Sequence, residues 1–210
     1  CPLKEIRGKF GLITMFHVLE HIADPVAMLA EVRDKLSDEG ILVVDIPDYR
    51  QNPFDLFVAD HCTHFSLLTI SDVMGRAGFD TIVVDDKLVP KETVTIAKKT
   101  GKAAGAAGMS GIKADPRGSI APYLVWADSF LEKADKLSRE GDLGIFGTSI
   151  AATWLLSRVG GRVKFFVDED PARCGKSYMG LPIYHPGDIP KGSSVFLALP
   201  SNVAEGIRKR

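Results

Sequence analysis

The chain has 210 residues, enough for one large domain or two small ones with buried cores. Its 26 Lys and Arg residues against 27 Asp and Glu give a net charge of −1, which excludes a large basic surface for nucleic acid. No apolar run approaches the roughly 20 residues that span a bilayer. Three well-separated cysteines fit neither a disulfide framework nor a zinc knuckle. These features predict a cytoplasmic α/β protein with no nucleic-acid or membrane partner.

The first hundred residues alternate between strand and helix patterns. The nearly continuous apolar run Phe10–Phe16 predicts a central parallel strand. The dipeptide Asp24-Pro25 begins a helix that Gly40 ends, because proline suits the first helical position and glycine the position after the last. A second buried strand is expected over residues 41–46.

An irregular, aromatic-rich loop follows, and Ser71-Asp72 is expected to open a helix that runs to Gly78. Residues 81–86 and 92–98 then predict two strands joined by a turn. The order of these elements predicts a mostly parallel, three-layer α/β sheet with a hairpin at its edge.

Residues 100–121 are rich in Gly and Ala and lack the apolar mass for a core, so they predict a linker between domains at 1–99 and 122–210. The second domain is expected to be a smaller Rossmann-like α/β unit. Its predicted elements are a helix over 122–140, a strand over 143–147, a helix opened by Thr148-Ser149, strands over 164–168, 181–184 and 194–199, and a last helix from Ser201.

His17, Glu20 and His21 match the H-x-x-E-H pattern of inverted zinc metalloproteases. That chemistry needs both imidazoles on one face of a helix. Here the helix begins only at Asp24, and no third ligand stands out downstream. A ligand site beyond the carboxyl end of the strand is therefore favoured over a zinc protease. The plainer alternative is that these side chains only line the strand end.

The stretch from Phe10 to Pro47 resembles the fourth strand, fourth helix and fifth strand of class I S-adenosylmethionine-dependent methyltransferases. The resemblance lies in the H-V-L-E-H turn after the strand, the helix opened by D-P, and the next strand ending in Pro. It implies S-adenosylmethionine as the cofactor. It also implies that Phe16, His17 and Glu20 lie at the methionine end of the cofactor, with His21 facing the substrate.

The segment from Asp60 to Ser66 resembles the E-H-x-x-Y-F-S segment of sugar C-methyltransferases, which act on nucleotide-linked ketosugars and carry a Rossmann-like carboxyl-terminal domain. This resemblance implies C-methylation of a nucleotide sugar, with His61 as general base and His64 at the substrate. Two departures stand out: Val58 takes the place of a family tyrosine, and His64 that of an aromatic hydroxyl.

The chemistry itself favours His61 as a base. Methylation of a carbon beside a carbonyl requires removal of an α-proton, and an imidazole that titrates near neutrality suits that step. Asp60, the neighbouring carboxylate, would assist it, so both residues are candidate catalytic groups. We expect His61 to lie in an exposed loop and to matter for turnover rather than folding.

Two alternatives for His61 are open. It could anchor the loop through backbone hydrogen bonds, or it could hold a metal together with Cys62, His64 and either His17 or His21. Because H-x-x-H spacing in a loop is unspecific, no metal is expected.

In the second domain, Gly147–Ala152 is a degraded G-x-G-x-x-G pattern, and Asp168 lies where an acid could meet a ribose. The stretch 166–183 resembles Rossmann-like domains appended to sugar-modifying enzymes, which shape the substrate site. We therefore expect Ser149 and Asp168 to contact substrate, and no NAD to bind.

The Gly-rich turn and the ribose-binding acid of methyltransferases would both precede Phe10. We therefore expect residues 1–210 alone to bind S-adenosylmethionine weakly or not at all. An apolar sheet edge left open would also invite self-association into a homo-oligomer. The alternative function is a non-catalytic module that binds a nucleotide sugar or a dinucleotide and uses the methyltransferase part as a scaffold.

Overall fold

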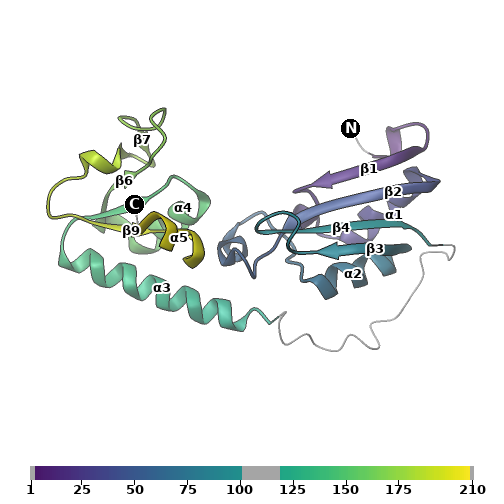
Figure 1. Cartoon of the computed structure of the whole chain (residues 1–210), viewed down its shortest axis with the longest axis horizontal. Coiled ribbons are helices and arrows are strands. Elements are labelled where there is room, and N and C mark those ends of the chain that lie inside the picture. The colour runs from purple at the N-terminus through teal and green to yellow at the C-terminus, as the bar shows by residue number, and fades with distance from the viewer. Residues whose placement is uncertain (1–2, 101–118, 209–210) are drawn as a thin grey trace. The chain divides into compact units, whose positions relative to one another are not determined.

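The structure, a computed structural model, describes residues 3–100 and 119–208 (Figure 1). The chain divides into two compact units, Cys1–Ser119 and Ile120–Arg210, and each is described by itself. The predicted Gly/Ala-rich linker falls almost entirely on residues 101–118, which lie outside the described residues. Both units combine helices with sheets that contain parallel strands, as expected for an α/β protein. No described helix is long and apolar enough to cross a membrane.

The first unit holds a four-stranded sheet in the order β1-β2-β4-β3. Strands β1 and β2 are parallel, whereas β4 is antiparallel to both β2 and β3, so this sheet is mixed rather than mostly parallel. Its elements are η1 (Leu3–Glu5), β1 (Phe10–Phe16), η2 (Leu19–His21), α1 (Pro25–Lys35), β2 (Leu36–Pro47), η3 (Pro53–Phe57), α2 (Leu67–Arg76), β3 (Phe79–Asp85) and β4 (Glu92–Lys99).

A single core lies between this sheet and both of its α-helices. Helix α1 contributes Leu29 and Val32, and α2 contributes Ile70 and Met74. They pack against alternate residues of the strands, which point to the same face of the sheet. Residues 3–100 therefore form two layers, not the three that the order of elements predicts (Figure 1).

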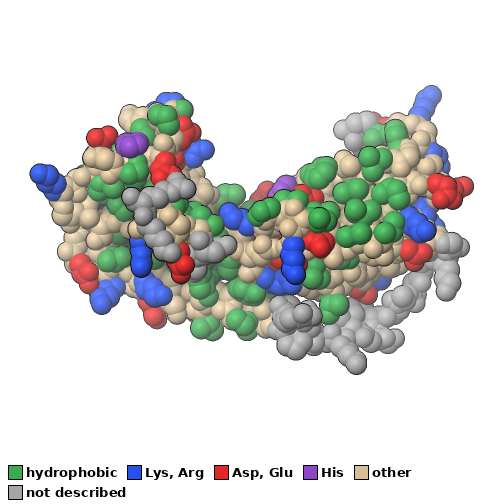
Figure 2. Space-filling view, in the orientation of Figure 1, with side chains coloured by type: hydrophobic (Ala, Val, Ile, Leu, Met, Phe, Trp, Pro, Cys, Tyr) green, Lys and Arg blue, Asp and Glu red, His purple; other side chains and the backbone are tan. Residues whose placement is uncertain are grey.

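Strand β1 lies at the edge of the described sheet and not at its centre. It pairs only with β2, and Leu12 and Phe16 are 58% and 56% exposed. Figure 2 shows hydrophobic side chains gathered over this unit. Within the described residues β1 is therefore not central, and it forms an open apolar sheet edge of the kind that the sequence also leads us to expect. An apolar run predicts strand structure but does not place the strand's neighbours.

The end of α1 differs from the prediction. Asp24 caps the helix as expected, its side chain accepting a hydrogen bond from the Ala27 amide, but the helix ends at Lys35 rather than at Gly40. Gly40 instead lies within β2, where a Cβ would come within 2.9 Å of the Phe10 carbonyl oxygen. Because Gly40 has no side chain, β1 can approach β2 closely at this position. Gly40 therefore serves strand packing and does not end the helix.

The start of α2 also differs. The cap is Ser66 and not Ser71, because the Ser66 side chain accepts from the Thr69 amide while Thr69 Oγ1 accepts from the Ser66 amide. Ser71 lies inside the helix, where its hydroxyl donates to the Leu67 carbonyl. This reciprocal capping box fixes where the long loop ends.

The second unit holds a five-stranded sheet in the order β7-β8-β6-β5-β9. All pairings are parallel except that of β7 with β8. The predicted helices and strands are present, and β7 is a short addition that the sequence does not signal. The elements are α3 (Ala121–Glu140), β5 (Leu143–Phe146), α4 (Ile150–Val159), η5 (Gly160–Arg162), β6 (Val163–Val167), β7 (Ser177–Tyr178), β8 (Leu181–Tyr184), η6 (Pro186–Asp188), β9 (Ser194–Leu197) and α5 (Ser201–Arg208).

Candidate active site

A strained turn follows β1 at the carboxyl ends of the two parallel strands. His17 has a φ of +51°, a backbone conformation that is uncommon outside glycine, and its amide donates to the Asp45 carbonyl of β2. Glu20 and His21 follow in the single turn of η2. The H-x-x-E-H residues thus lie beyond the strand ends, where ligands bind in open α/β sheets, and not along the long helix of a zinc protease.

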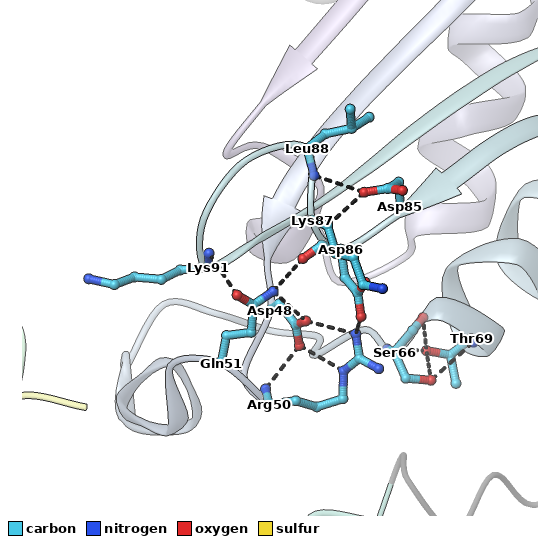
Figure 3. Close-up of polar contacts among 10 residues, drawn as sticks. All are labelled: Asp48, Arg50, Gln51, Ser66, Thr69, Asp85, Asp86, Lys87, Leu88 and Lys91. Carbon is cyan, nitrogen blue, oxygen red and sulfur yellow. Dashed lines mark hydrogen bonds and ion pairs between the residues drawn. The ribbon is translucent and has the colours of Figure 1, made fainter. Parts of the chain in front are cut away.

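A buried ion-pair network holds the start of the loop over residues 48–66 (Figure 3). Arg50 Nε and Nη2 donate to Asp48 Oδ1 and Oδ2 at 2.8 and 2.7 Å, and Nη2 also donates to Asp86 at 2.8 Å. Gln51 Nε2 donates to the Asp86 carbonyl. Hydrogen bonding to Asp48 raises the pKa of the Arg50 guanidinium. The network ties the loop to the connection between β3 and β4.

The far part of the same loop is tied to η2. The amides of Cys62 and Thr63 donate to the Glu20 carbonyl at 2.7 and 3.2 Å. His61 is thereby brought against His21, with ring centroids 4.8 Å apart and nearly perpendicular planes. The turn after β1 and the histidine loop, about forty residues apart in the sequence, therefore form one site.

Asp55 of η3 connects the two histidines of the loop. Its Oδ1 lies 2.8 Å from His61 Nδ1, and its Oδ2 lies 3.0 Å from His64 Nδ1. The His64 contact is a hydrogen bond, whereas His61 Nδ1 is close to the carboxylate but not aligned to donate to it. Asp55 is itself buried, so its charge is directed at these two rings. Sequence reasoning missed it, although an acid inside the apolar segment Pro53–Phe57 was a visible signal.

Two expectations about the loop need correction. The His61 side chain is only 9% exposed, so it does not lie in an exposed loop. Asp60, expected to assist His61, is 76% exposed, and its carboxylate lies 3.2 Å from His21 Nδ1 instead. The reason is that the backbone bonds to Glu20 turn residues 60 and 61 in different directions, which the order of residues does not reveal.

Three carboxylates crowd around His17. Its Nδ1 lies 3.4 Å from Glu20 Oε1, and its Nε2 lies 3.6 Å from Glu92 Oε1 of β4. Both Glu20 oxygens and Asp45 Oδ1 are buried and accept no hydrogen bond from residues 3–100 or 119–208. Burial raises the pKa of Asp45, against the effect of His17. The sequence did not predict Asp45 and Glu92 as site residues. Both lie on strands, and what a strand carboxylate faces depends on how the strands pair, which the sequence does not show.

Burial also raises the pKa of Glu92 to about 7. His17 opposes this rise, whereas the nearby carboxylates of Asp45, Glu20 and Asp55 add to it. Four carboxylates therefore gather at the strand ends: Glu92 lies beside His17, Glu20 beside His17 and His21, and Asp55 beside His61 and His64, while Asp45 is near His17. A cationic group, such as the sulfonium or the ammonium of S-adenosylmethionine, fits this environment better than an anion does.

The raised pKa of Glu92 has a testable effect on stability. Because the folded-state pKa lies above the ordinary 4.5, folding favours the protonated form, and the free energy of unfolding should fall as pH rises from about 4.5 to 7. Glu92→Gln should remove this fall and leave the first unit more stable at pH 8 by about 1 to 3 kcal/mol. Hydrogen exchange of the β4 amides at pH 5 and pH 8, with a metal chelator present, measures the free energy of unfolding of the parent and of the variant.

The exposed Glu39 of β2 provides the matched control, since Glu39→Gln should leave the pH dependence as in the parent. A Glu92→Gln protein whose stability changes with pH as steeply as the parent's would show that Glu92 is ionised without cost in the folded state.

The two predicted site residues of the second unit already have partners. Ser149 caps α4 by accepting from the Ala152 amide. Asp168, which is buried, accepts from Thr148 Oγ1 at 3.3 Å and from Arg173 Nη1 at 3.1 Å. Gly147, directly after β5, has a φ of +81°, a backbone conformation that favours glycine. Contact of either residue with substrate stays a prediction.

Residues 3–84 match a family model described as "Methyltransferase domain". The matched span includes the turn after β1, the loop with Asp55 and His61, and the anchoring network of Asp48 and Arg50. No curated protein matches the sequence.

Solved structures of methyltransferases also resemble the chain. The O-methyltransferase NcsB1 from neocarzinostatin biosynthesis, in complex with S-adenosylmethionine and 2-hydroxy-5-methyl naphthoic acid, is 13% identical over 46% of this chain and 31% of its own, with a TM-score of 0.41. The dimethyltransferase RosA from Streptomyces davawensis is 20% identical over 48% and 33%, also at 0.41. The chain thus spans about a third of the length of these proteins. The proposed function rests on the match of residues 3–84 to the methyltransferase family model and not on these structural likenesses.

Proposed function

We propose that this chain belongs to an enzyme that transfers a methyl group from S-adenosylmethionine to a small molecule. The observation that carries the proposal is that residues 3–84, which match a methyltransferase domain, contain the acid–histidine site at the strand ends except for Glu92. When bound, S-adenosylmethionine supplies an electrophilic methyl group on a sulfonium.

The turn after β1 would hold the cationic part of this cofactor. Glu20 offers two buried carboxylate oxygens that have no hydrogen bond within the described residues. Phe16, the exposed last residue of β1, offers an apolar surface at the start of the same turn. His17 lies between Glu20 and Glu92, so a neutral imidazole there would leave both carboxylates to face a cationic ligand.

His61 would act as the proton acceptor. It would take a proton from the carbon or oxygen that is methylated, and the electron pair left behind would form the new bond to the methyl group while the sulfur–methyl bond breaks, its electron pair staying on the sulfur of the departing thioether. Asp55 positions the His61 imidazole through the 2.8 Å contact at Nδ1, which leaves Nε2 for the reaction. Such contacts are often poorly aligned in the absence of ligands and tighten when substrate binds.

We further propose that the acceptor is a nucleotide-linked ketosugar that is methylated at carbon. The support is the likeness of the segment Asp60–Ser66 to sugar C-methyltransferases. His21 and His64 lie beside His61 and would meet the sugar hydroxyls.

The test is to incubate the full-length protein with methyl-deuterated S-adenosylmethionine and a panel of nucleotide-linked ketosugars, with their reduced alcohols as matched controls. We expect the label on a carbon beside the ketone, identified by NMR, and no transfer to the alcohols. Label on an oxygen would overturn C-methylation, and no transfer to any small molecule would overturn the enzymatic function.

A further inference from the structure

Three side chains of the candidate site converge on one point. One imidazole nitrogen of His21, one of His61 and one carboxylate oxygen of Glu20 lie within 4.8 Å of one another. His21 Nε2 lies 3.9 Å from Glu20 Oε1. Donors around a tetrahedral zinc ion are roughly 3.4 Å apart, given metal–nitrogen distances of about 2.0 to 2.1 Å. Small side-chain rotations would therefore suffice to close the set around an ion.

Each histidine has a carboxylate close to its Nδ1. His21 Nδ1 lies 3.2 Å from Asp60 Oδ2, and His61 Nδ1 lies 2.8 Å from Asp55 Oδ1. Metal-binding histidines usually carry such a partner, because it fixes the ring and strengthens the ligand nitrogen. In His21 this leaves Nε2, which lies 3.9 Å from Glu20 Oε1, as the nitrogen available to a metal ion.

Glu20 supplies an independent observation. Its side chain is 2% exposed, and neither carboxylate oxygen has a hydrogen bond within the described residues. A buried carboxylate that lacks hydrogen bonds is costly, and a bound cation relieves that cost. The backbone of Glu20 is fixed by the amides of Cys62 and Thr63, so the carboxylate is held beside the two rings.

We propose that Glu20, His21 and His61 bind one divalent transition-metal ion of the zinc class. Two imidazoles and one carboxylate suit zinc, cobalt or ferrous ions, whereas magnesium prefers oxygen donors throughout. Three protein ligands leave at least one coordination position for an oxygen of a small molecule. The proposal goes beyond the methyl-transfer function, and a bound ion changes His61 from a proton acceptor into a ligand.

The test uses the 210-residue chain after removal of metals by a chelator. Titration with Co²⁺ should give visible d–d absorption that saturates at one equivalent and is displaced by Zn²⁺. His21→Ala and Glu20→Gln should each weaken Co²⁺ binding at least tenfold, by analogy with the loss on removing even an outer partner of a metal ligand. Circular dichroism and thermal unfolding of each variant verify that it folds.

Two variants serve as controls. Cys62→Ser removes a thiol that lies 3.5 Å from the His21 carbonyl but belongs to neither ligand set, so this variant should bind Co²⁺ as the parent does. For the same reason, the Co²⁺ spectrum of the parent should show no sulfur-to-cobalt charge-transfer band. His64→Ala tests the neighbouring set of Asp55, His61 and His64, and it too should leave the affinity within a few-fold.

No saturable Co²⁺ binding, or binding that folded His21→Ala and Glu20→Gln retain in full, would overturn the proposal. If only His64→Ala lost Co²⁺ binding, the ion would be assigned to the set of Asp55, His61 and His64, and the proposal would again be overturned. Because this readout needs neither S-adenosylmethionine nor an acceptor, the metal proposal and the methyl-transfer proposal can fail separately.

Discussion

Replacing His61 by Ala should lower the rate of methyl transfer by the full-length protein about a hundredfold or more, the usual effect of losing a general base. The physical reason is that no other imidazole takes its position: His64 is hydrogen-bonded to Asp55, and His21 is oriented by Asp60. The rate constant should also lose the rising limb of its pH profile, since that limb reports deprotonation of the base.

The controls follow from the burial of His61. Because its ring contacts His21, His61→Gln should be assayed beside His61→Ala to separate lost packing from lost proton transfer. Asp55→Asn should lower kcat more than it raises KM, because Asp55 positions the ring and does not touch the acceptor. Activity within a few-fold of the parent in folded His61→Ala would remove His61 from the mechanism.

Replacing Arg50 by Met should destabilise the first unit by about 3 to 5 kcal/mol, the usual cost of removing one partner of a buried ion pair. Asp48 is 0% exposed and would lose both of its guanidinium hydrogen bonds. The ion pair between Arg50 and Asp86 would be lost as well, which leaves the Gln51 hydrogen bond to the Asp86 carbonyl as the loop's remaining side-chain contact with Asp86. Hydrogen exchange of β2 and β4 amides measures the free energy of unfolding for this unit.

Arg76→Met is the matched control. Arg76 pairs with Asp72 at 3.8 Å on the surface of α2, and exposed pairs of this kind contribute between 0 and about 1 kcal/mol. If Arg50→Met cost no more than Arg76→Met, the network in Figure 3 would not be what anchors the loop.

Local patterns in the sequence predict most of the helices and strands correctly. The Asp24-Pro25 helix start and the turn of His17, Glu20 and His21 at the strand end are both present as expected. These features depend on neighbours in the chain, which a sequence shows directly. The start of α2 was missed because Ser66 is followed by Thr69 at the third position, where the usual signature has Glu or Gln.

Long-range partners could not be predicted in the same way. Glu92 reaches the site only because β4 inserts between β2 and β3, and Asp60 turns to His21 because of two backbone bonds to Glu20. The edge position of β1 likewise depends on sheet order rather than on its own apolar residues. The histidines of the candidate site and Glu20 could therefore be predicted from the sequence, whereas the acids Asp45, Asp55 and Glu92 could not.

The central claim is that the strand-end site receives S-adenosylmethionine, and an NMR titration of the full-length protein with this cofactor tests it most directly. The imidazole resonances of His17, His21, His61, His64 and His185 would be assigned by single substitutions. We predict saturable shifts at His17 and His21 as the cationic ligand meets Glu20, with His185 of the second unit unchanged. Saturable shifts confined to His185, or none at all, would contradict the account.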